Sequence, residues 1–253
     1  VTGSDINGCL DTASISVQVD QLPNVVASSA FNSICLGDSV LISASGALNY
    51  QWGNGVQISN QYVSPTTIGN NSYIVTGSDV NSCSNSDTVN ILVNSLPIAQ
   101  VSASDTNICI NDTITLLSSA ASNYQWNNGS TSQSQTLILG NAGTTIFTVT
   151  IFDNNLCSAT DSVIVNVNNN PIVSVSANNN NICIGESVTL SATGAINYLW
   201  DNGITSSTQV ITPSTSAILT YSVVGTDINS CSANAQVNIT VNPLPNTGPI
   251  FHN

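Results

Sequence analysis

Short runs in which hydrophobic and polar residues alternate recur along the whole chain. In one of them Ile15, Val17 and Val19 are separated by polar residues, a pattern typical of a β-strand with one buried face. Equivalent triplets follow at Val89, Ile91, Val93, at Val163, Val165, Val167 and at Val237, Ile239, Val241. No stretch has the period of an amphipathic helix. The pattern therefore predicts an all-β protein.

The triplets belong to an internal repeat. The differences 109 − 35 and 183 − 109 between Cys35, Cys109 and Cys183 both equal 74. The same step relates three further sets: Trp52, Trp126, Trp200; Cys9, Cys83, Cys157, Cys231; and Pro23, Pro97, Pro171, Pro245. A constant step without drift predicts a tandem array of one structural unit.

The step sets the expected domain boundaries. Residues 1–22 are the C-terminal part of a repeat, and complete repeats cover 23–96, 97–170 and 171–244. Residues 245–253 form a linker or the start of a next repeat. Because the sequence begins inside a repeat and lacks a leader, we expect it to be a segment of a longer exported protein.

Within one repeat the pattern predicts seven short strands. They begin at Val25, Val40 and Tyr50, continue as two strands within 58–63, and end with strands at Tyr73 and Val89. Asn-Gly pairs at 54–55, 128–129 and 202–203 indicate tight turns. Seven strands around one central Trp predict a β-sandwich, with Trp52, Trp126 and Trp200 in the cores.

Composition narrows the possible partners. The chain has no Lys or Arg, 13 acidic residues and one His, for a formal net charge of −13. Without cations it is not expected to bind nucleic acid or an anionic membrane surface. No run approaches the ~20 apolar residues of a membrane span, so no direct membrane insertion is expected.

Several motifs together resemble a known family. They are Ile-Cys-x-Gly-[Asp/Glu]-Ser-Val, Tyr-x-Trp, Asn-Gly, Tyr-x-Val and Asp-x-Asn-x-Cys followed by a Val-rich strand and Leu-Pro. This set resembles the Ig-like (PKD-like) repeats of giant surface proteins in Bacteroidota, including gliding-motility adhesins. The resemblance covers the chain up to about residue 245 and implies export by the type IX system, surface display, and adhesion or filament formation. Asn111 departs from Gly37 and Gly185, and Ile151 departs from Gly77 and Gly225.

Candidate chemistry is sparse, and no catalytic, cofactor or metal site is expected. His252 has no second His, Lys or Arg with which to build a catalytic group. The repeated Asp-x-Asn before Cys fits either a calcium ligand pair or an Asx-turn, and the turn is favoured because calcium needs six to eight oxygens. The Tyr and Trp of Tyr-x-Trp fit core packing better than a carbohydrate platform.

Five short motifs resemble an O-glycosylation sequon of Bacteroidota surface proteins, which leaves glycan attachment open beside a simple polar entry into a strand. They lie at 11–13, 38–40, 87–89, 112–114 and 161–163.

The seven cysteines favour an oxidising compartment. A scheme internal to each repeat pairs Cys35–Cys83, Cys109–Cys157 and Cys183–Cys231. In an Ig-like sandwich, however, the first and second cysteine of one repeat lie at opposite ends, ~17–20 Å apart for a short strand. Strand direction therefore favours bridges between successive repeats, Cys35–Cys157 and Cys109–Cys231. Cys9, Cys83 and Cys183 then pair outside the segment or stay unpaired. The internal scheme and reduced thiols remain open.

These features predict a rod-like array of Ig-like repeats that forms a structural shaft segment of an extracellular cell-surface adhesin or filament, used for attachment, gliding or cell–cell contact. Copies of the chain are expected to associate with one another. The rival interpretation is a set of spacer repeats in a secreted hydrolase or carbohydrate-binding protein.

Overall fold

The structure is a computed structural model that describes residues 1–248. Every regular element within these residues is a β-strand, which confirms the expected all-β class. In this part of the chain no helix has the length and apolar character of a membrane span. The predicted linker at 245–253 lies partly, and His252 entirely, outside the described residues.

The described residues fall into two compact units. Unit 1 comprises Val1–Pro97 together with Phe152–Ser158, and unit 2 comprises Ile98–Ile151 and the chain from Ala159 onward. Unit 1 holds an N-terminal hairpin and repeat 1 (23–96). Unit 2 holds most of repeat 2 (97–170) and repeat 3 (171–244).

Each repeat contains seven strands in the same order. Those of repeat 1 are β3 (Val26–Ser29), β4 (Ser33–Cys35), β5 (Val40–Ser45), β6 (Asn49–Trp52), β7 (Asn60–Val63), β8 (Gly69–Ser78) and β9 (Ser84–Asn94). Repeat 2 has β10 (Val101–Ala103), β11 (Asn107–Cys109), β12 (Thr113–Ser118), β13 (Asn123–Trp126), β14 (Ser134–Ile138), β15 (Gly143–Phe152) and β16 (Ser158–Asn168). Repeat 3 has β17 (Ser174–Ala177), β18 (Asn181–Cys183), β19 (Val188–Thr193), β20 (Asn197–Trp200), β21 (Thr208–Ile211), β22 (Ala217–Thr226) and β23 (Ser232–Asn242).

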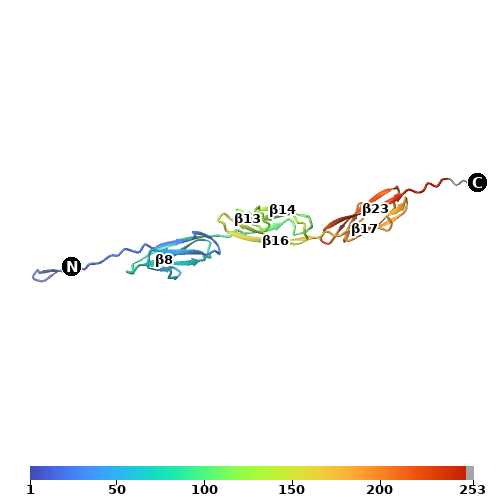
Figure 1. The fold of residues 1–253 in the computed structure, drawn as a ribbon. Helices are drawn as coiled ribbons and strands as arrows, with labels where there is room; N and C mark the ends of the chain where they lie inside the picture. The colour runs from blue at the N-terminus through green and yellow to red at the C-terminus, as the bar shows by residue number, and fades with distance from the viewer. Residues whose placement is uncertain (249–253) are drawn as a thin grey trace, which may run out of the picture. The chain divides into compact units, whose positions relative to one another are not determined.

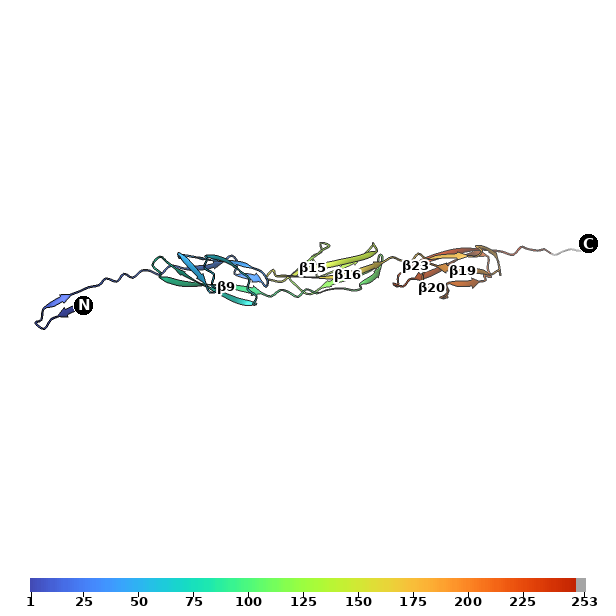
Figure 2. The ribbon, with the colours of Figure 1, turned by 90° about the horizontal axis from the view of Figure 1, so that it is seen from below.

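Two sheets pack face to face in every repeat (Figure 1). In repeat 1 the smaller sheet has the order β3-β5-β7 and the larger sheet β4-β9-β8-β6. The long antiparallel pair of the larger sheet is easiest to follow as β15 and β16 of repeat 2 (Figure 2). The short strand β4 pairs in parallel with β9, with Cys35 opposite Asn94. This parallel strand places Cys35 at the C-terminal end of β9.

The inward faces of both sheets form one apolar core per repeat. Trp52, Trp126 and Trp200 are at most 2% exposed. Their indole Nε1 groups donate to the backbone carbonyls of Ile58, Ser132 and Ser206, at 2.8–2.9 Å. The alternation of the sequence is preserved, since Val89, Ile91 and Val93 are buried while their neighbours face solvent.

One predicted strand is not present. Residues 53–59 form no strand, so only one of the two strands expected within 58–63 is found, as β7. The Asn54-Gly55 turn closes with a hydrogen bond from Gly55 N–H to the Trp52 carbonyl (2.8 Å). The Ile58 carbonyl accepts the indole N–H of Trp52, and the two ends of the segment bond to β8 (Gly53 N–H to the Ile74 carbonyl) and to β5 (Ala44 N–H to the Ser59 carbonyl). The missing seventh strand is supplied by β4, which the sequence pattern did not reveal.

The N-terminal segment also differs from expectation. Strands β1 (Thr2–Ser4) and β2 (Leu10–Thr12) form a hairpin with the same pairing register as the connected ends of β8 and β9. Ile15, Val17 and Val19, however, lie in no strand and are 78–89% exposed. The hairpin is a separate two-stranded sheet, and no further strand pairs with it or with this triplet in the described residues. The predicted burial of this triplet is therefore wrong for this chain.

Candidate functional site: the disulfide junctions

Two disulfides dominate the chemistry of the described chain. They join Cys35 to Cys157 and Cys109 to Cys231, with Cα–Cα distances of 5.5 Å, as bridged cysteines require. Both bonds link a strand-end cysteine, at the end of β4 or β11, to a loop cysteine of the following repeat. Cys9, Cys83 and Cys183 are unbonded. This connectivity is the between-repeat scheme.

Strand geometry explains why the internal pairs do not form. Cys109 lies opposite Asn168, the last residue of β16, whereas Cys157 directly precedes Ser158, the first residue of β16. Strand β16 has 11 residues, and at ~3.3 Å per residue its ends are roughly 33 Å apart. A disulfide between Cys109 and Cys157 would therefore need the repeat to unfold.

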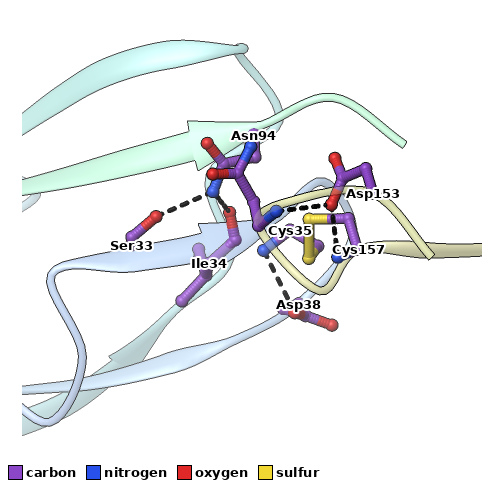
Figure 3. Close-up of a disulfide and its surroundings, with 8 residues drawn as sticks. Ser33, Ile34, Cys35, Asp38, Asn94, Asp153 and Cys157 are labelled. Carbon is purple, nitrogen blue, oxygen red and sulfur yellow. Dashed lines mark hydrogen bonds between the residues drawn. A yellow bond between two sulfur atoms is a disulfide. The ribbon is translucent and has the colours of Figure 1, made fainter. Parts of the chain in front are cut away.

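The strand-end cysteine is positioned by an amide clamp (Figure 3). The Asn94 side chain donates from Nδ2 to Ser33 Oγ (2.7 Å) and to the Ile34 carbonyl (3.2 Å), which fixes β4 against β9. The backbone N–H of Cys35 donates to Asp38 Oδ2 at 3.2 Å. Cys35 is thereby held at a fixed position where β9 leaves the repeat.

The loop cysteine is positioned by an Asx-turn. Asp153 Oδ1 accepts the backbone N–H groups of Asn155 (2.8 Å) and Cys157 (2.9 Å), as Figure 3 shows for Cys157. The residue before the cysteine, Leu156, has a φ of 65°, a left-handed conformation that is costly for a side chain with a Cβ. One carboxylate thus folds the loop and presents its cysteine.

Equivalent loops have the same fold in every copy. The same pair of backbone hydrogen bonds is made by Asp5, Asp79 and Asp227, at 2.8–2.9 Å. In the first loop the backbone N–H groups of Cys9 and Asn7 hold the pKa of the Asp5 carboxyl below its usual range. Within residues 1–248 no three His, Cys, Asp or Glu side chains converge on a possible metal position. The hydrogen bonds of each Asp-x-Asn motif are those of an Asx-turn.

Burial distinguishes bonded from unbonded loop cysteines. Cys157 and Cys231 are 0% exposed, whereas Cys83 is partly exposed and Cys9 is exposed. The loop is the same in each case, so this difference arises from the bonded repeat that covers Cys157 and Cys231.

The Trp residues do not form a ligand platform. Their side chains lie inside the sandwiches, with no ring face open to a sugar. The neighbouring Tyr50 is also engaged, since its hydroxyl accepts the Ala47 N–H and donates to the Ala47 carbonyl, both at 2.9 Å.

The glycosylation-like motifs occupy exposed positions. Ser39, Thr88, Thr113 and Ser162 are solvent-exposed: Ser39 precedes β5, Thr113 begins β12, and the other two lie within β9 and β16. Two of the preceding carboxylates have a structural role, since Asp87 and Asp161 accept the backbone N–H groups of Ala27 (2.7 Å) and Val101 (2.8 Å). The N–H groups of Ala27 and Thr88 hold the pKa of Asp87 below its usual range. Glycan attachment at these hydroxyls stays a prediction.

Sequence reasoning missed the amide clamp. Asn94, Asn168 and Asn242 recur at the 74-residue step and make equivalent contacts. The recurrence of this Asn at the repeat step was therefore visible in the sequence. Nothing in the sequence, however, indicated that a short parallel strand lies beside it.

Comparisons with known proteins find similarity to solved structures of tandem β-domains. No family model and no curated protein matches the chain. Among solved structures, three Ig domains of titin (I67–I69, an E-to-A variant) are 13% identical, cover 88% of this chain and 100% of theirs, and give a TM-score of 0.39. A Ca2+-stabilised adhesin with which an Antarctic bacterium binds ice is 12% identical, covers 95% of this chain and 80% of its own, and scores 0.38. Fibronectin(III)-like modules of CbhA from Clostridium thermocellum are 13% identical, cover 57% of this chain and 95% of theirs, and score 0.32.

These TM-scores are too low to carry an argument. The assignment to tandem Ig-like β-sandwich repeats rests on the strand order and sheet pairing of the chain itself.

Proposed function

We propose that the chain is a tension-bearing structural segment of an extracellular cell-surface adhesin or filament. The observation that carries this proposal is the interleaving of the two disulfide loops. The loop closed by Cys35 and Cys157 overlaps the loop closed by Cys109 and Cys231 over residues 109–157. Stable disulfides are typical of proteins outside the cytosol, which supports an extracellular location.

The interleaved bonds shorten the covalent path that a pulling force follows. The backbone from Val1 to Gly248 has 247 Cα–Cα links. Through both disulfides the path has 99: 34 from Val1 to Cys35, 48 from Cys157 back to Cys109, and 17 from Cys231 to Gly248. Even a fully unfolded oxidised chain is therefore shorter than the reduced chain by about 480–520 Å, at ~3.3–3.6 Å per residue.

Because the two loops interleave, either disulfide alone still keeps the covalent path through the chain short. When either disulfide is lost, the remaining one still gives a path of 125 backbone links, only 26 more than with both. At ~3.3–3.6 Å per residue, loss of one bond adds about 80–90 Å of length, and loss of both adds about 480–520 Å. A second disulfide that preserves most of the limit on chain length suits a fibre that is loaded repeatedly.

Single-molecule force spectroscopy tests this role, with the chain held at both ends and extended until every repeat is unfolded. Cys35→Ser and Cys109→Ser are each expected to lengthen the unfolded chain slightly, and the double variant is expected to lengthen it fully. Cys183→Ser is the matched control and leaves the length unchanged. If Cys183→Ser instead adds the 48 links that an internal bridge to Cys231 would remove, the interleaved path does not exist.

The polar, cation-free surface supports lateral association of copies in a filament. The outward faces of β8 and β9 carry neutral hydrogen-bonded pairs, such as Thr76 Oγ1 with Ser86 Oγ (2.9 Å) and Ser72 Oγ with Asn90 Oδ1 (2.7 Å). Immunogold labelling of cells with an antibody to this chain is expected to decorate thin surface fibres. Label found only on a soluble secreted hydrolase would favour spacer repeats instead.

A further inference from the structure

Three Asn-Gly pairs, at 54–55, 128–129 and 202–203, lie in equivalent turns of the three repeats and take no part in the disulfide junctions. An asparagine deamidates most readily before glycine, because glycine has no Cβ to keep its backbone nitrogen away from the side-chain amide carbon. We propose that these three asparagines are modification sites that deamidate only while the repeat around them is open. Each site then records how long its own repeat has spent unfolded.

Burial does not protect these asparagines in the folded repeats. Asn54, Asn128 and Asn202 are all exposed, so water and base reach their side-chain amides. Protection in the folded state therefore has to come from the way in which the turn is held.

The nitrogen that must attack is engaged in the folded turn. Gly129 N–H donates to the Trp126 carbonyl at 3.0 Å, and Trp126 N–H donates to the Ser130 carbonyl at 2.9 Å. The equivalent bonds of repeats 1 and 3 are 2.8–2.9 Å long. Because the tryptophan of each turn is a buried core residue, freeing the glycine nitrogen means displacing the end of a core strand.

The amide that must leave is held by a residue of the opposite sheet. Asn128 Nδ2 donates to Gln135 Oε1 (2.8 Å), and Asn128 Oδ1 accepts the backbone N–H of Ser130 (3.2 Å). Asn128 follows β13 of the four-stranded sheet, whereas Gln135 lies on β14 of the three-stranded sheet. Equivalent pairs join the sheets of the other repeats, Asn54 with Gln61 (2.8 Å) and Asn202 with Gln209 (2.6 Å). Turning the amide toward the glycine nitrogen therefore breaks a link between the two sheets.

The reaction consumes water and releases ammonia. Once the turn is open, base removes the proton from the Gly129 nitrogen, and this nitrogen attacks Cγ of Asn128. The Cγ–Nδ2 bond breaks, ammonia leaves with one added proton, and a five-membered succinimide remains. Water then opens the ring at either carbonyl, which gives an aspartyl or an isoaspartyl residue with one new negative charge.

The folded turn accommodates the aspartyl product and not the isoaspartyl product. In the described part of the chain, the Nε2 groups of Gln135 and Gln209 are buried and have no acceptor. An aspartate at position 128 or 202 keeps Oδ1 for the backbone N–H two residues on, and its second oxygen accepts from this Nε2 once the Gln amide turns over. The isoaspartyl product instead adds a methylene to the main chain of a turn that two backbone hydrogen bonds close, so a repeat that carries it is expected to refold poorly.

The test compares the folded chain with the chain unfolded in guanidinium chloride, both in a mildly alkaline buffer. Mass spectrometry of peptic peptides follows deamidation at each site over time. In the folded chain all three sites are expected to react at least about tenfold more slowly, since each 1.4 kcal/mol of opening free energy gives a factor of ten. Asn7-Gly8, in the two-stranded hairpin outside the sandwiches, shows that the buffer supports the reaction. Equal rates at Asn128 in the folded and the unfolded chain would overturn the proposal.

Opening one repeat is expected to affect one site. Trp126→Ala destabilises repeat 2 and should raise the rate at Asn128 by at least about tenfold, while the rates in repeats 1 and 3 stay the same and serve as internal controls. An unchanged rate at Asn128 in this variant would contradict the proposal.

A second variant tests the link between the sheets. Gln135→Leu removes the partner of the Asn128 amide and is expected to speed deamidation there by up to about tenfold, as for the loss of one hydrogen bond. Gln125→Leu, at an exposed position of β13, is the matched control. Equal rates at Asn128 in the two variants would contradict the protective role of the amide pair. The proposal of a tension-bearing segment is tested by chain length and does not depend on this reaction.

Discussion

Repeat 2 has Ile151 at the position where repeats 1 and 3 have Gly77 and Gly225, and this difference gives a prediction that tests the packing of repeat 2. A Cβ on Gly77 would lie 2.6 Å from Ala47 Cβ and 2.7 Å from Val25 Cγ2, so repeats 1 and 3 need glycine here. In repeat 2 the position equivalent to Val25 is Ala99, and Ile151 beside it is fully buried. The two methyl groups missing from Ala99 remove one of these two close contacts, whereas Ala121 keeps the methyl group equivalent to that of Ala47.

Substitutions at Ala99 and Ile151 are expected to have strongly coupled effects on stability. Ile151→Gly removes a buried four-carbon side chain and should cost about 3–6 kcal/mol, including the penalty for glycine in a strand. Ala99→Val forces two methyl groups toward Ile151 and should cost about 1–3 kcal/mol. The double variant recreates the pair found at Val25 and Gly77. It should therefore be about 1–3 kcal/mol more stable than the sum of the single effects.

Hydrogen exchange measured on peptic peptides of β15 and β16 gives the opening free energy of repeat 2 without assuming that the whole chain unfolds in one step. Repeats 1 and 3 serve as internal references in the same sample. Gly77→Ile is the reciprocal variant, and Val25→Ala should rescue it. Strictly additive effects of Ala99→Val and Ile151→Gly would refute the explanation.

Three further results are expected. Trp126→Ala should destabilise repeat 2 by about 3–5 kcal/mol, seen as faster exchange of its strands; unchanged exchange would mean that Trp126 is not a core residue. Leu156→Gly should stabilise its loop by about 1 kcal/mol because glycine accepts a positive φ, whereas Leu156→Ala should give no gain in the same exchange assay. The folded-state pKa of Asp87 lies below its unfolded value, so the stability that this carboxylate contributes is present above about pH 4 and is lost as the pH falls through the folded pKa. Repeat 3 has Ala235 at this position and should not show this loss of stability. The Asp87→Asn variant should not show it in repeat 1 either.

Much of the fold could be predicted because the strands are amphipathic and the repeat has a constant step. Buried triplets such as Val89, Ile91 and Val93 need only a period of two, and the repeat step carries one assignment to every copy. Strand direction favoured the between-repeat disulfide scheme over the internal one, because direction does not depend on where each strand ends. Asn111 is explained in the same register, since its φ of 68° matches the positive φ of Gly37 and Gly185.

The remaining features depend on contacts between residues far apart in the chain. Strand β4 has three residues and pairs in parallel with β9, so it has no alternation long enough to detect. The clamp of Asn94 depends on that strand. The left-handed conformations of Ser82, Leu156 and Ser230 follow from the Asx-turn, although Gly8 at the same repeat position was a usable signal. Ile15, Val17 and Val19 are exposed because they lie outside both sheets of repeat 1.

Peptide mapping under non-reducing conditions tests the central claim most directly. The chain has no Lys or Arg, so the digestion uses pepsin at acidic pH, where thiol exchange is also slow. The account predicts two disulfide-linked peptide pairs, Cys35 with Cys157 and Cys109 with Cys231. A Cys109–Cys157 or Cys35–Cys83 pair from the native protein would contradict it, because each would close a repeat on itself and leave successive repeats without a covalent bridge.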